Sequence, residues 1–456
     1  MLTYNAHIMR HTVAGRQAPG GISGRPLRGS STISDSARIG REHHPVSRKL
    51  ISQAALRVLY TLNEAGFDAY LVGGGVRDIL AGIEPKDFDI ATNAHPEQVK
   101  ELFRSCRLVG RRFVIAHVRF GREIIEVTTF RGALTDSHER DETGRILSDN
   151  VYGSDICSDA QRRDFTVNGL YYDISDFSIL DYVGGVADMQ ARCIRLIGDP
   201  ELRYREDPVR MLRAVRIANK LEFTIDPGTL APIGKLAQLL GEVPPARLFD
   251  EVLKLLQCRD AVANFAGLVD TGLLPELFPQ LAQCIHEKAV RGLIDDALAN
   301  TARRIANEQP VTPAFLFATL LWPVVSRRAA VLEAEAELPP APALAQAADE
   351  ALVQQVERVA IPKRFSAPAR EIWMMQSRFA FRRGKRPQRL MAHPRFRAAY
   401  DFYCLRAEAG EADAEIAQWW TDAQNDPANL PPAAESAAAP ARRRRRRRGG
   451  AGNAGQ

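Results

Sequence analysis

The chain has 456 residues, 45% of them hydrophobic, so it can bury a large core and is expected to divide into two to four domains. Its six cysteines include no Cys-x-x-Cys pair, which argues against a zinc ribbon or a disulfide framework and indicates a reducing, cytoplasmic environment. The longest apolar run, Phe315 to Val325, is shorter than the roughly 18–20 residues that span a bilayer, so no membrane partner is expected.

The net charge of +6 is unevenly distributed along the chain. Residues 1–50 carry +6 and residues 441–456 carry +7, which leaves residues 51–440 negative by about 7. A flexible polycation binds phosphate backbones with little sequence preference, so nucleic acid is the expected partner. The Gly-, Arg- and Ser-rich segment 1–44 is expected to be disordered, although it also has the composition of a transit peptide. Residues 426–456, which are Ala/Pro-rich and then carry an arginine run, are expected to be a disordered cationic tail.

The first expected elements are a helix and a strand that lead to a glycine-rich turn. Apolar residues recur at helical spacing from Ser47 to Gly66, and Ala69–Val72 is an apolar run of strand length. Three glycines follow, Gly73 to Gly75, and they lack the Cβ that would keep a phosphate away from the backbone. A short helix over Val76–Ala81 would then direct its first amides, together with Arg77, toward an anion.

Two acids follow in Asp87-Phe88-Asp89, which is expected to form a strand. Side chains two apart in a strand point to the same face, so both carboxylates would be directed to one point while Phe88 turns to the core. Neighbouring carboxylates cannot both ionise at low cost unless a cation lies between them. Paired hard cations serve in-line phosphoryl transfer, so two Mg²⁺ ions bound by Asp87 and Asp89 are expected.

Taken alone, each motif is weak, since three glycines usually make a turn and Asp-x-Asp usually lies on a solvated strand edge. Together, Gly-Gly-x-Val-Arg-Asp and the following Asp-x-Asp resemble the catalytic motif of the nucleotidyltransferase superfamily. Within it they are similar to the class that holds bacterial poly(A) polymerases and CCA-adding tRNA nucleotidyltransferases. The resemblance implies an α+β fold, in which a polymerase-beta-like head with a mixed sheet precedes an all-helical body.

On this basis we expect five parts: a basic extension (1–44), a catalytic head (45–183), a nucleotide-selecting and RNA-binding neck (184–260), a helical RNA-binding body (261–425) and an Arg-rich tail (426–456). From Pro244 onward the apolar spacing predicts seven helices separated by short Gly- and Pro-containing linkers.

Another acid lies in a predicted hairpin, Val114–Phe120 with Ile124–Phe130. Glu126 is in its second strand, and it stands beside Asp87 and Asp89 if the strands are neighbours. A solvated strand residue is an equally good interpretation.

The run Arg162-Arg163-Asp164-Phe165-Thr166-Val167-Asn168 would by itself be an ion pair on a turn. It resembles the family's second motif, whose arginine and acid attend the incoming triphosphate and ribose. The resemblance implies that Arg163 binds nucleotide and that Asp164 is the third catalytic acid, ahead of Glu126.

A helix is expected over Tyr204–Arg216, with Glu206, Arg210 and Arg213 on one face. Surface salt bridging would explain this face, but Glu-Asp-x-x-Arg resembles the protein template that reads the base edge of the incoming nucleotide. Asp207 and Arg210 offer the paired hydrogen-bonding groups that a base edge needs. The nucleotide-binding residues implied are Gly73, Gly74, Arg77, Arg163, Asp207, Arg210 and Arg213.

The polymer made is indicated by Arg107–Phe113, which resembles an element of poly(A) polymerases, although Val114 and Ile115 follow where the family often has a cation. The RNA-binding residues expected are Arg111, Arg112, Arg442, Arg443, Arg444 and Arg445. The segment from Arg378 to Arg386, which mixes aromatic and cationic side chains, suits RNA or a solvated helix end equally.

The implied activity is that of a polynucleotide adenylyltransferase, which transfers AMP from ATP to an RNA 3′ hydroxyl without a template and releases pyrophosphate. RNA-decay or RNA-chaperone proteins are further expected partners. The alternatives are a CCA-adding enzyme acting on tRNA and an inactive RNA-binding scaffold.

Overall fold

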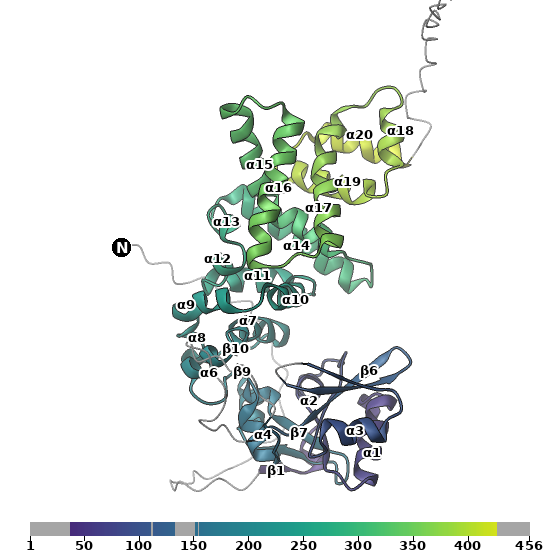
Figure 1. The fold of residues 1–456 in the computed structure, drawn as a ribbon, viewed down its shortest axis with the longest axis vertical. Helices are drawn as coiled ribbons and strands as arrows, with labels where there is room; N and C mark the ends of the chain where they lie inside the picture. Colours follow the sequence, from purple (N-terminus) through teal and green to yellow (C-terminus); the bar gives the residue numbers. More distant parts are fainter. Residues whose placement is uncertain (1–36, 111–112, 133–150, 154, 426–456) are drawn as a thin grey trace, which may run out of the picture. The chain divides into compact units, whose positions relative to one another are not determined.

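The computed structural model describes residues 37–110, 113–132, 151–153 and 155–425. They form an eight-stranded mixed sheet followed by a long series of helices (Figure 1). The expected α+β class, with the sheet first and the helical body second, is confirmed. The predictions for residues 1–36, 111–112 and 426–456 lie outside the described residues.

The sheet has the strand order β1-β8-β7-β2-β3-β6-β5-β4, and every neighbouring pair is antiparallel except β3 with β6. Its strands are β1 (Ala37–Ile39), β2 (Ala69–Val72), β3 (Asp89–Thr92), β4 (Cys106–Val109), β5 (Ile115–Phe120), β6 (Glu123–Thr129), β7 (Leu170–Asp173) and β8 (Ile179–Asp181). The expected first strand and hairpin are confirmed as β2, β5 and β6. The expectation of disorder was wrong for residues 37–44, because β1 pairs with β8 at the sheet edge and η1 (Arg41–His43) follows it.

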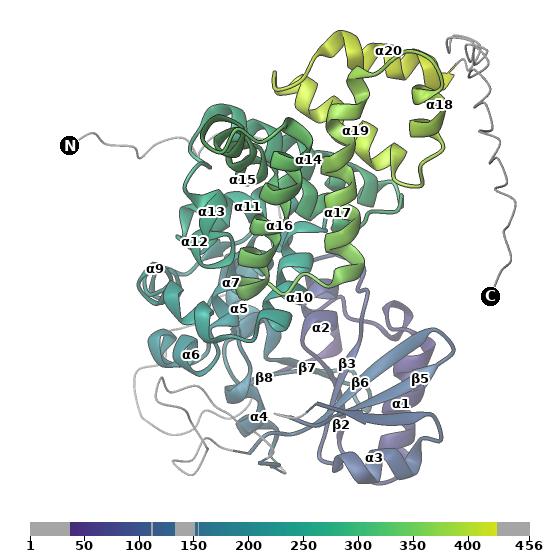
Figure 2. The ribbon, with the colours of Figure 1, turned by 45° about the horizontal axis from the view of Figure 1, so that its top comes forward.

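Helices cover both faces of this sheet. On one face, α1 (Gln53–Glu64) and α3 (Pro96–Leu102) share a core with the sheet (Figure 2). Helix α1 begins where the Ser52 hydroxyl accepts from the Ala55 amide, after η2 (Arg48–Leu50). On the other face, Ala160 of α4 (Ile156–Arg162) packs against strand residues such as Tyr171.

The short η3 (Thr166–Asn168) leads into β7, and after β8 the chain leaves the sheet through α5 (Gly185–Ala191). A small parallel pair follows, β9 (Cys193–Ile194) with β10 (Thr224–Ile225). Between these two strands lie α6 (Pro200–Glu206) and α7 (Val209–Leu221). The single helix expected over 204–216 was wrong, since Pro208 lacks an amide hydrogen and restricts Asp207 to extended backbone, with φ −154°.

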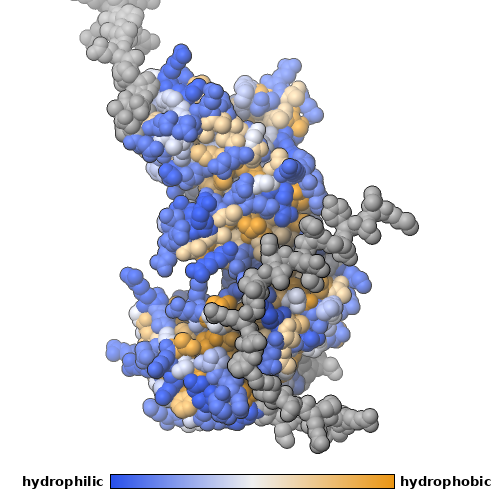
Figure 3. Space-filling view, turned by 180° about the vertical axis from the view of Figure 1, so that it is seen from behind, coloured by the Kyte–Doolittle hydropathy of each residue, from blue (hydrophilic) through white to orange (hydrophobic). Residues whose placement is uncertain are grey.

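The remaining elements are helical. They are α8 (Pro227–Leu230), α9 (Ile233–Leu236), η4 (Ala237–Glu242), α10 (Pro245–Leu256), α11 (Ala261–Asp270), α12 (Leu274–Leu277), α13 (Pro279–Ala282), α14 (Lys288–Ala306), α15 (Pro313–Glu335), α16 (Pro340–Arg358), α17 (Lys363–Gln376), η5 (Ser377–Ala380), α18 (Arg386–Met391), α19 (Phe396–Glu408) and α20 (Ala414–Asn425). One buried apolar cluster runs from Phe165 through α7 and these helices to Trp420. Hydrophilic side chains dominate the face shown in Figure 3, with apolar patches between them.

Among the described residues, α15 is the one helix long and apolar enough to span a bilayer. It packs inside the helical body against α14, α16 and α17, with Phe317 and Trp322 buried. This packing accounts for its apolar composition.

Candidate active site

The acidic part of the site lies where β3 and β6 run side by side. Asp89, the first residue of β3, is in register with Glu126 of β6 and with Val72 of β2. Register partners direct their side chains to the same face, so Asp89 and Glu126 are neighbours. His117 of β5 extends the row, with its Nε2 3.5 Å from Glu126 Oε1. The position of Glu126, left open by the sequence, is therefore beside Asp89.

Asp87 precedes β3 instead of lying in it, so the expectation that both acids alternate within one strand was wrong for this residue. Phe88 turns into the core as expected. Burial raises the pKa of Asp89 to about 6, with further contributions from the charges of Glu126 and Asp87 and an opposing one from Arg163. Ionisation of Asp89 is therefore unfavourable in this cluster of acids, and a bound cation would stabilise the ionised form.

Carboxylate oxygens are the donors that hard divalent cations prefer, so the chemistry of Asp87, Asp89 and Glu126 fits such an ion. Within the part of the chain that the structure describes, no group of three or more Asp, Glu, His or Cys side chains is already gathered to hold a metal ion. The fit therefore rests on donor chemistry and on the raised pKa of Asp89.

The glycine turn meets these acids at Gly73. Its backbone has φ +74° and ψ −136°, a conformation that side chains disfavour. A Cβ placed on Gly73 would lie 3.4 Å from Asp89 Oδ2 and 3.7 Å from Arg163 Nη1. The turn that opens α2 (Gly74–Leu80), one acid and one cation therefore converge at one point.

Two residues that sequence reasoning missed hold Arg163 in this place. Asp159 Oδ2 accepts from Arg163 Nη2 at 2.9 Å, and the Tyr171 hydroxyl accepts from Arg163 Nε at 2.8 Å. The i, i+4 spacing of Asp159 and Arg163 is a usable sequence signal, whereas nothing local marks Tyr171. These contacts leave Nη1 on the side of Gly73.

Asp164 turns to different partners. Its Oδ1 accepts from the Asn168 side-chain amide at 2.9 Å and its Oδ2 from Arg213 Nε at 2.8 Å. Burial by itself would raise the pKa of Asp164, but Arg213 and the hydrogen bonds hold it well below its usual range. The acid in register with Asp89 is Glu126, while Asp164 pairs with Arg213, so the role of Asp164 as third catalytic acid stays a prediction.

Arg77 is only 6% exposed and is also occupied within the protein. Its Nε and Nη2 donate to Asp78 Oδ1 at 2.9 and 2.6 Å, and its Nη1 donates to Asn168 Oδ1 at 2.7 Å. These contacts favour a role in holding the glycine turn over direct binding of phosphate.

The predicted base-reading residues lie at the break between α6 and α7, with Asp207 in the break and Arg210 in the first turn of α7. Both carboxylate oxygens of Asp207 accept from Arg247 of α10, each at 2.8 Å. Arg210 donates to the Arg203 carbonyl at 2.6 Å and to Glu206 Oε2 at 3.2 Å, so the expected contact with Glu206 forms across the break. Arg247 is 40 residues from Asp207, and no sequence signal identified it.

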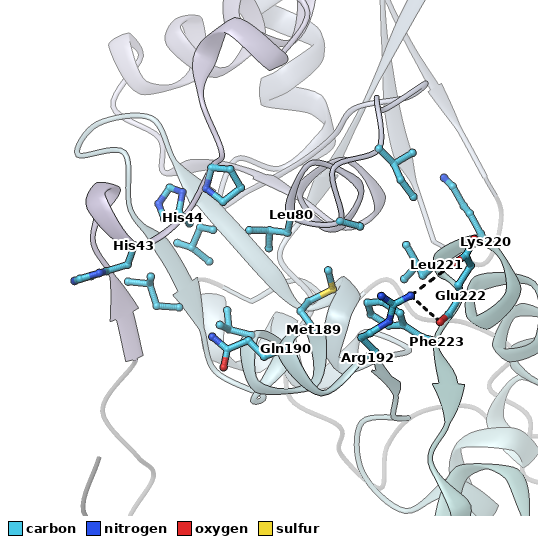
Figure 4. A pocket seen from close by; sticks show the side chains of 16 residues that line it. His43, His44, Leu80, Met189, Gln190, Arg192, Lys220, Leu221, Glu222 and Phe223 are labelled. Carbon is cyan, nitrogen blue, oxygen red and sulfur yellow. Dashed lines mark hydrogen bonds and ion pairs between the residues drawn. The ribbon is translucent and has the colours of Figure 1, made fainter. Parts of the chain in front are cut away.

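A separate cavity of about 610 Å³ lies on the far end of α2. Leu80 and Met189 lie near its middle, and Arg192 is bonded to Glu222 at its side (Figure 4). Its lining includes none of the expected site residues, so it is distinct from the acidic site.

The mixed sheet, beside which a glycine turn, neighbouring acids and an arginine come together, is the head of a nucleotidyltransferase. Family models described as "Poly A polymerase head domain", "Probable RNA and SrmB- binding site of polymerase A" and "Polymerase A arginine-rich C-terminus" match residues 69–195, 222–285 and 336–450. The chain is 51% identical over 406 residues to Poly(A) polymerase I of Salmonella typhi, covering 86% of each chain. It is 45% identical over 389 residues to Poly(A) polymerase I of Haemophilus influenzae, covering 83% of this chain and 86% of that one. The chain therefore belongs to the poly(A) polymerase I family.

CCA-adding enzymes are more distant in sequence. That of Levilactobacillus brevis is 39% identical over 230 residues, which are 48% of this chain and 54% of that one. Among solved structures, a CCA-adding enzyme in apo form I has a TM-score of 0.57 at 19% identity, with 84% of this chain and 83% of that chain covered. A tRNA nucleotidyltransferase complexed with a primer tRNA and an incoming ATP analogue has a TM-score of 0.53 at 22% identity, with 81% of this chain and 98% of that chain covered. These structures confirm the fold.

The expected activity is confirmed by the family: the protein is a polynucleotide adenylyltransferase that adds AMP from ATP to RNA without a template. It uses ATP and a divalent metal ion as nucleotidyltransferases do. The CCA-adding enzymes are more distant relatives than the poly(A) polymerases, so that alternative is not favoured. Membership of a family of polymerases also argues against the inactive scaffold.

Proposed function

We propose that Asp87 and Asp89 hold two Mg²⁺ ions, with Glu126 adding its charge from the neighbouring strand. Ions held by these carboxylates would supply Lewis-acid chemistry, favouring ionisation of the RNA 3′ hydroxyl and stabilising the charge of the pyrophosphate leaving group. A carboxyl whose pKa is about 6 is ionised at neutral pH, as a ligand must be. Convergence of Asp89, Gly73 and Arg163 is the observation that carries this proposal.

The triphosphate of ATP is held, in this proposal, between the Gly73–Gly74 backbone and Arg163. Only glycine lets a phosphate approach the backbone this closely, and the side of Gly73 is lined by Arg163 Nη1. Asp159 and Tyr171 fix the guanidinium in advance, which reduces the ordering that binding requires.

Adenine is selected, we propose, by Asp207, Arg210 and Arg213. Arg247 holds both oxygens of Asp207, so the carboxylate has a fixed plane. A rigid set of donors and acceptors discriminates between base edges better than a mobile one, because a wrong base leaves buried polar groups unpaired.

We propose that an exposed part of the helical body also binds RNA. It would act together with the predicted residues Arg111, Arg112 and Arg442 to Arg445, which lie outside the described residues. Residues 372–400 contain eight Lys or Arg and no acid. Phe381 is 49% exposed, with the Arg386 guanidinium 4.8 Å from its ring centre. Bases stack on such rings while cations contact phosphate.

The RNA surface is tested by the salt dependence of binding of a labelled A20 oligonucleotide to the full chain. Replacing Arg383, Arg386 and Arg389 together by alanine should reduce the slope of log affinity against log salt by about 0.7 for each phosphate that the protein no longer neutralises. Phe381→Ala should weaken binding with little change in slope. Arg370→Ala is the matched control, because Asp349 already pairs with that exposed arginine. Equal slopes in all variants would contradict this surface.

The catalytic assignment is tested with Mg²⁺, an RNA primer and each of the four nucleotides supplied separately. ATP alone should give a long ladder of products, which Asp89→Asn should reduce by at least about a thousandfold, or ~4 kcal/mol of activation free energy. Glu126→Gln should also reduce the rate, whereas Glu123→Gln, an exposed residue on the same strand, should not. Unchanged activity in Asp89→Asn would refute the site.

We further propose a cytoplasmic location, without a membrane partner, and protein partners from RNA decay or RNA chaperoning. The match of residues 222–285 to a model described as a probable RNA and SrmB-binding site supports a protein contact in this region.

A further inference from the structure

Two ion pairs attach helix α7 to the sheet-containing head. Arg213 of α7 donates to Asp164, and Lys220 Nζ lies 2.6 Å from Asp78 Oδ2. Arg213 and Lys220 are seven residues apart, about two helical turns, so their side chains project from the same face of α7. Arg210, one of the proposed base-reading residues, is in the first turn of the same helix.

The two head acids are connected behind these ion pairs. Asp78 accepts from Arg77, Arg77 donates to Asn168 at 2.7 Å, and Asn168 donates to Asp164 at 2.9 Å. Lys220, Asp78, Arg77, Asn168, Asp164 and Arg213 thus form one continuous polar chain that starts and ends on α7. Arg77, Asp78 and Asn168 are each 6% exposed or less.

Such a chain transmits a change at one end because its middle members are buried. A buried carboxylate that loses a cationic partner must shift toward its remaining donors or draw in water. At Asp78 the remaining donor is Arg77, which also sets Asn168, so loss of Lys220 disturbs the support of Arg213 from a distance. Lys220 lies on the cavity shown in Figure 4, so a side chain of similar length fits there without a clash.

We propose that Asp78 and Lys220 are positioning residues that set where α7 presents Arg210 and Arg213 to the incoming nucleotide. They touch neither ATP nor the reacting atoms, and their effect is on nucleotide recognition. The inference rests on the proposed role of Arg213 in binding ATP.

The test compares Lys220→Met with Lys220→Arg in the full-length enzyme. For Lys220→Met we expect the KM for ATP to rise about five- to twentyfold while kcat changes less than about threefold, and the preference for ATP over CTP to fall. Lys220→Arg, which keeps the charge, should restore the KM to within about twofold. Lys235→Met, an exposed lysine on α9, is the matched control. Asp78→Asn should resemble Lys220→Met if it folds.

An unchanged KM in Lys220→Met, with only a lower melting temperature, would overturn the inference and leave a purely structural ion pair. Arg213→Ala separates the positioning role from the nucleotide site itself. If Arg213→Ala raises the KM for ATP and Lys220→Met does not, the positioning role fails alone. If Arg213→Ala leaves the KM unchanged, the proposed nucleotide site fails as well.

Discussion

At the scale of single residues, the protonation of Asp89 links metal binding to stability. Its pKa of about 6 in the folded protein exceeds the ordinary 3.8, so between roughly pH 4 and 6 the folded state binds more protons than the unfolded state. Without metal, stability should therefore fall as the pH rises through this window, because ionised Asp89 is buried and also faces Glu126 and Asp87.

This dependence is measured as the melting temperature in EDTA at pH 5 and pH 7.5. The wild-type protein should lose stability relative to Asp89→Asn at the higher pH, since the variant has no carboxyl to ionise. Added Mg²⁺ should narrow the difference. A gap between the two proteins that is the same at both pH values would contradict the assignment.

Gly73 supplies a second test at this scale. Gly73→Ala places a side chain at φ +74°, which costs about 1–2 kcal/mol, and puts a methyl group 3.4 Å from Asp89 Oδ2. We expect the KM for ATP to rise by about tenfold or more, measured by primer extension. Gly82→Ala is the control for backbone strain alone, because Gly82 has φ +73° and open space around it.

At the scale of elements, the meeting of α6, α7 and α10 determines base selection. Arg247→Met leaves the Asp207 carboxylate without the two donors that fix its plane. The ratio of kcat/KM for ATP to that for CTP should fall by about tenfold, roughly 1.4 kcal/mol. Arg259→Met, an exposed arginine just beyond α10, should leave the ratio unchanged. An unaltered ratio in Arg247→Met would remove Asp207 from the base-reading set.

The elements that the sequence predicts well are those fixed by local patterns. Strand β2, the β5–β6 hairpin and helix α1 follow from apolar spacing and the glycines that end it. The strand order does not, because β3 pairs in parallel with a strand more than thirty residues later and β1 closes an edge against β8. Such pairings depend on long-range contacts that no local window contains.

The residues of the site also divide into those that motifs indicate and those that only the fold brings together. The family resemblance implied that Gly73, Asp89 and Arg163 share one site, and the structure brings them together. The partners of Asp164 and Arg77 were not predictable, since Arg213 and Asn168 meet them from distant segments. A motif identifies which side chains carry charge, while the fold decides which of them face each other.

At the scale of the whole molecule, the large apolar cluster connects the site to the helical body. It includes Phe165, directly after Asp164, and Trp373, which is fully buried and donates to the Ala318 carbonyl at 2.8 Å. Trp373→Ala should lower the free energy of unfolding by about 3–5 kcal/mol. Because the core is continuous, activity should be normal at low temperature and lost earlier on heating. Loss of activity without any fall in melting temperature would contradict this.

The six-residue polar chain that joins Lys220 to Arg213 also constrains how this sequence can change in evolution. Each inner residue of this chain has one partner on either side of it. A single replacement therefore leaves two neighbouring residues without a partner, and one compensating replacement can restore the pairing of only one of them. Segments 77–78, 164–168 and 213–220 are far apart in the gene, yet selection should act on them as one unit. Across diverging descendants, these six positions should stay fixed or change together.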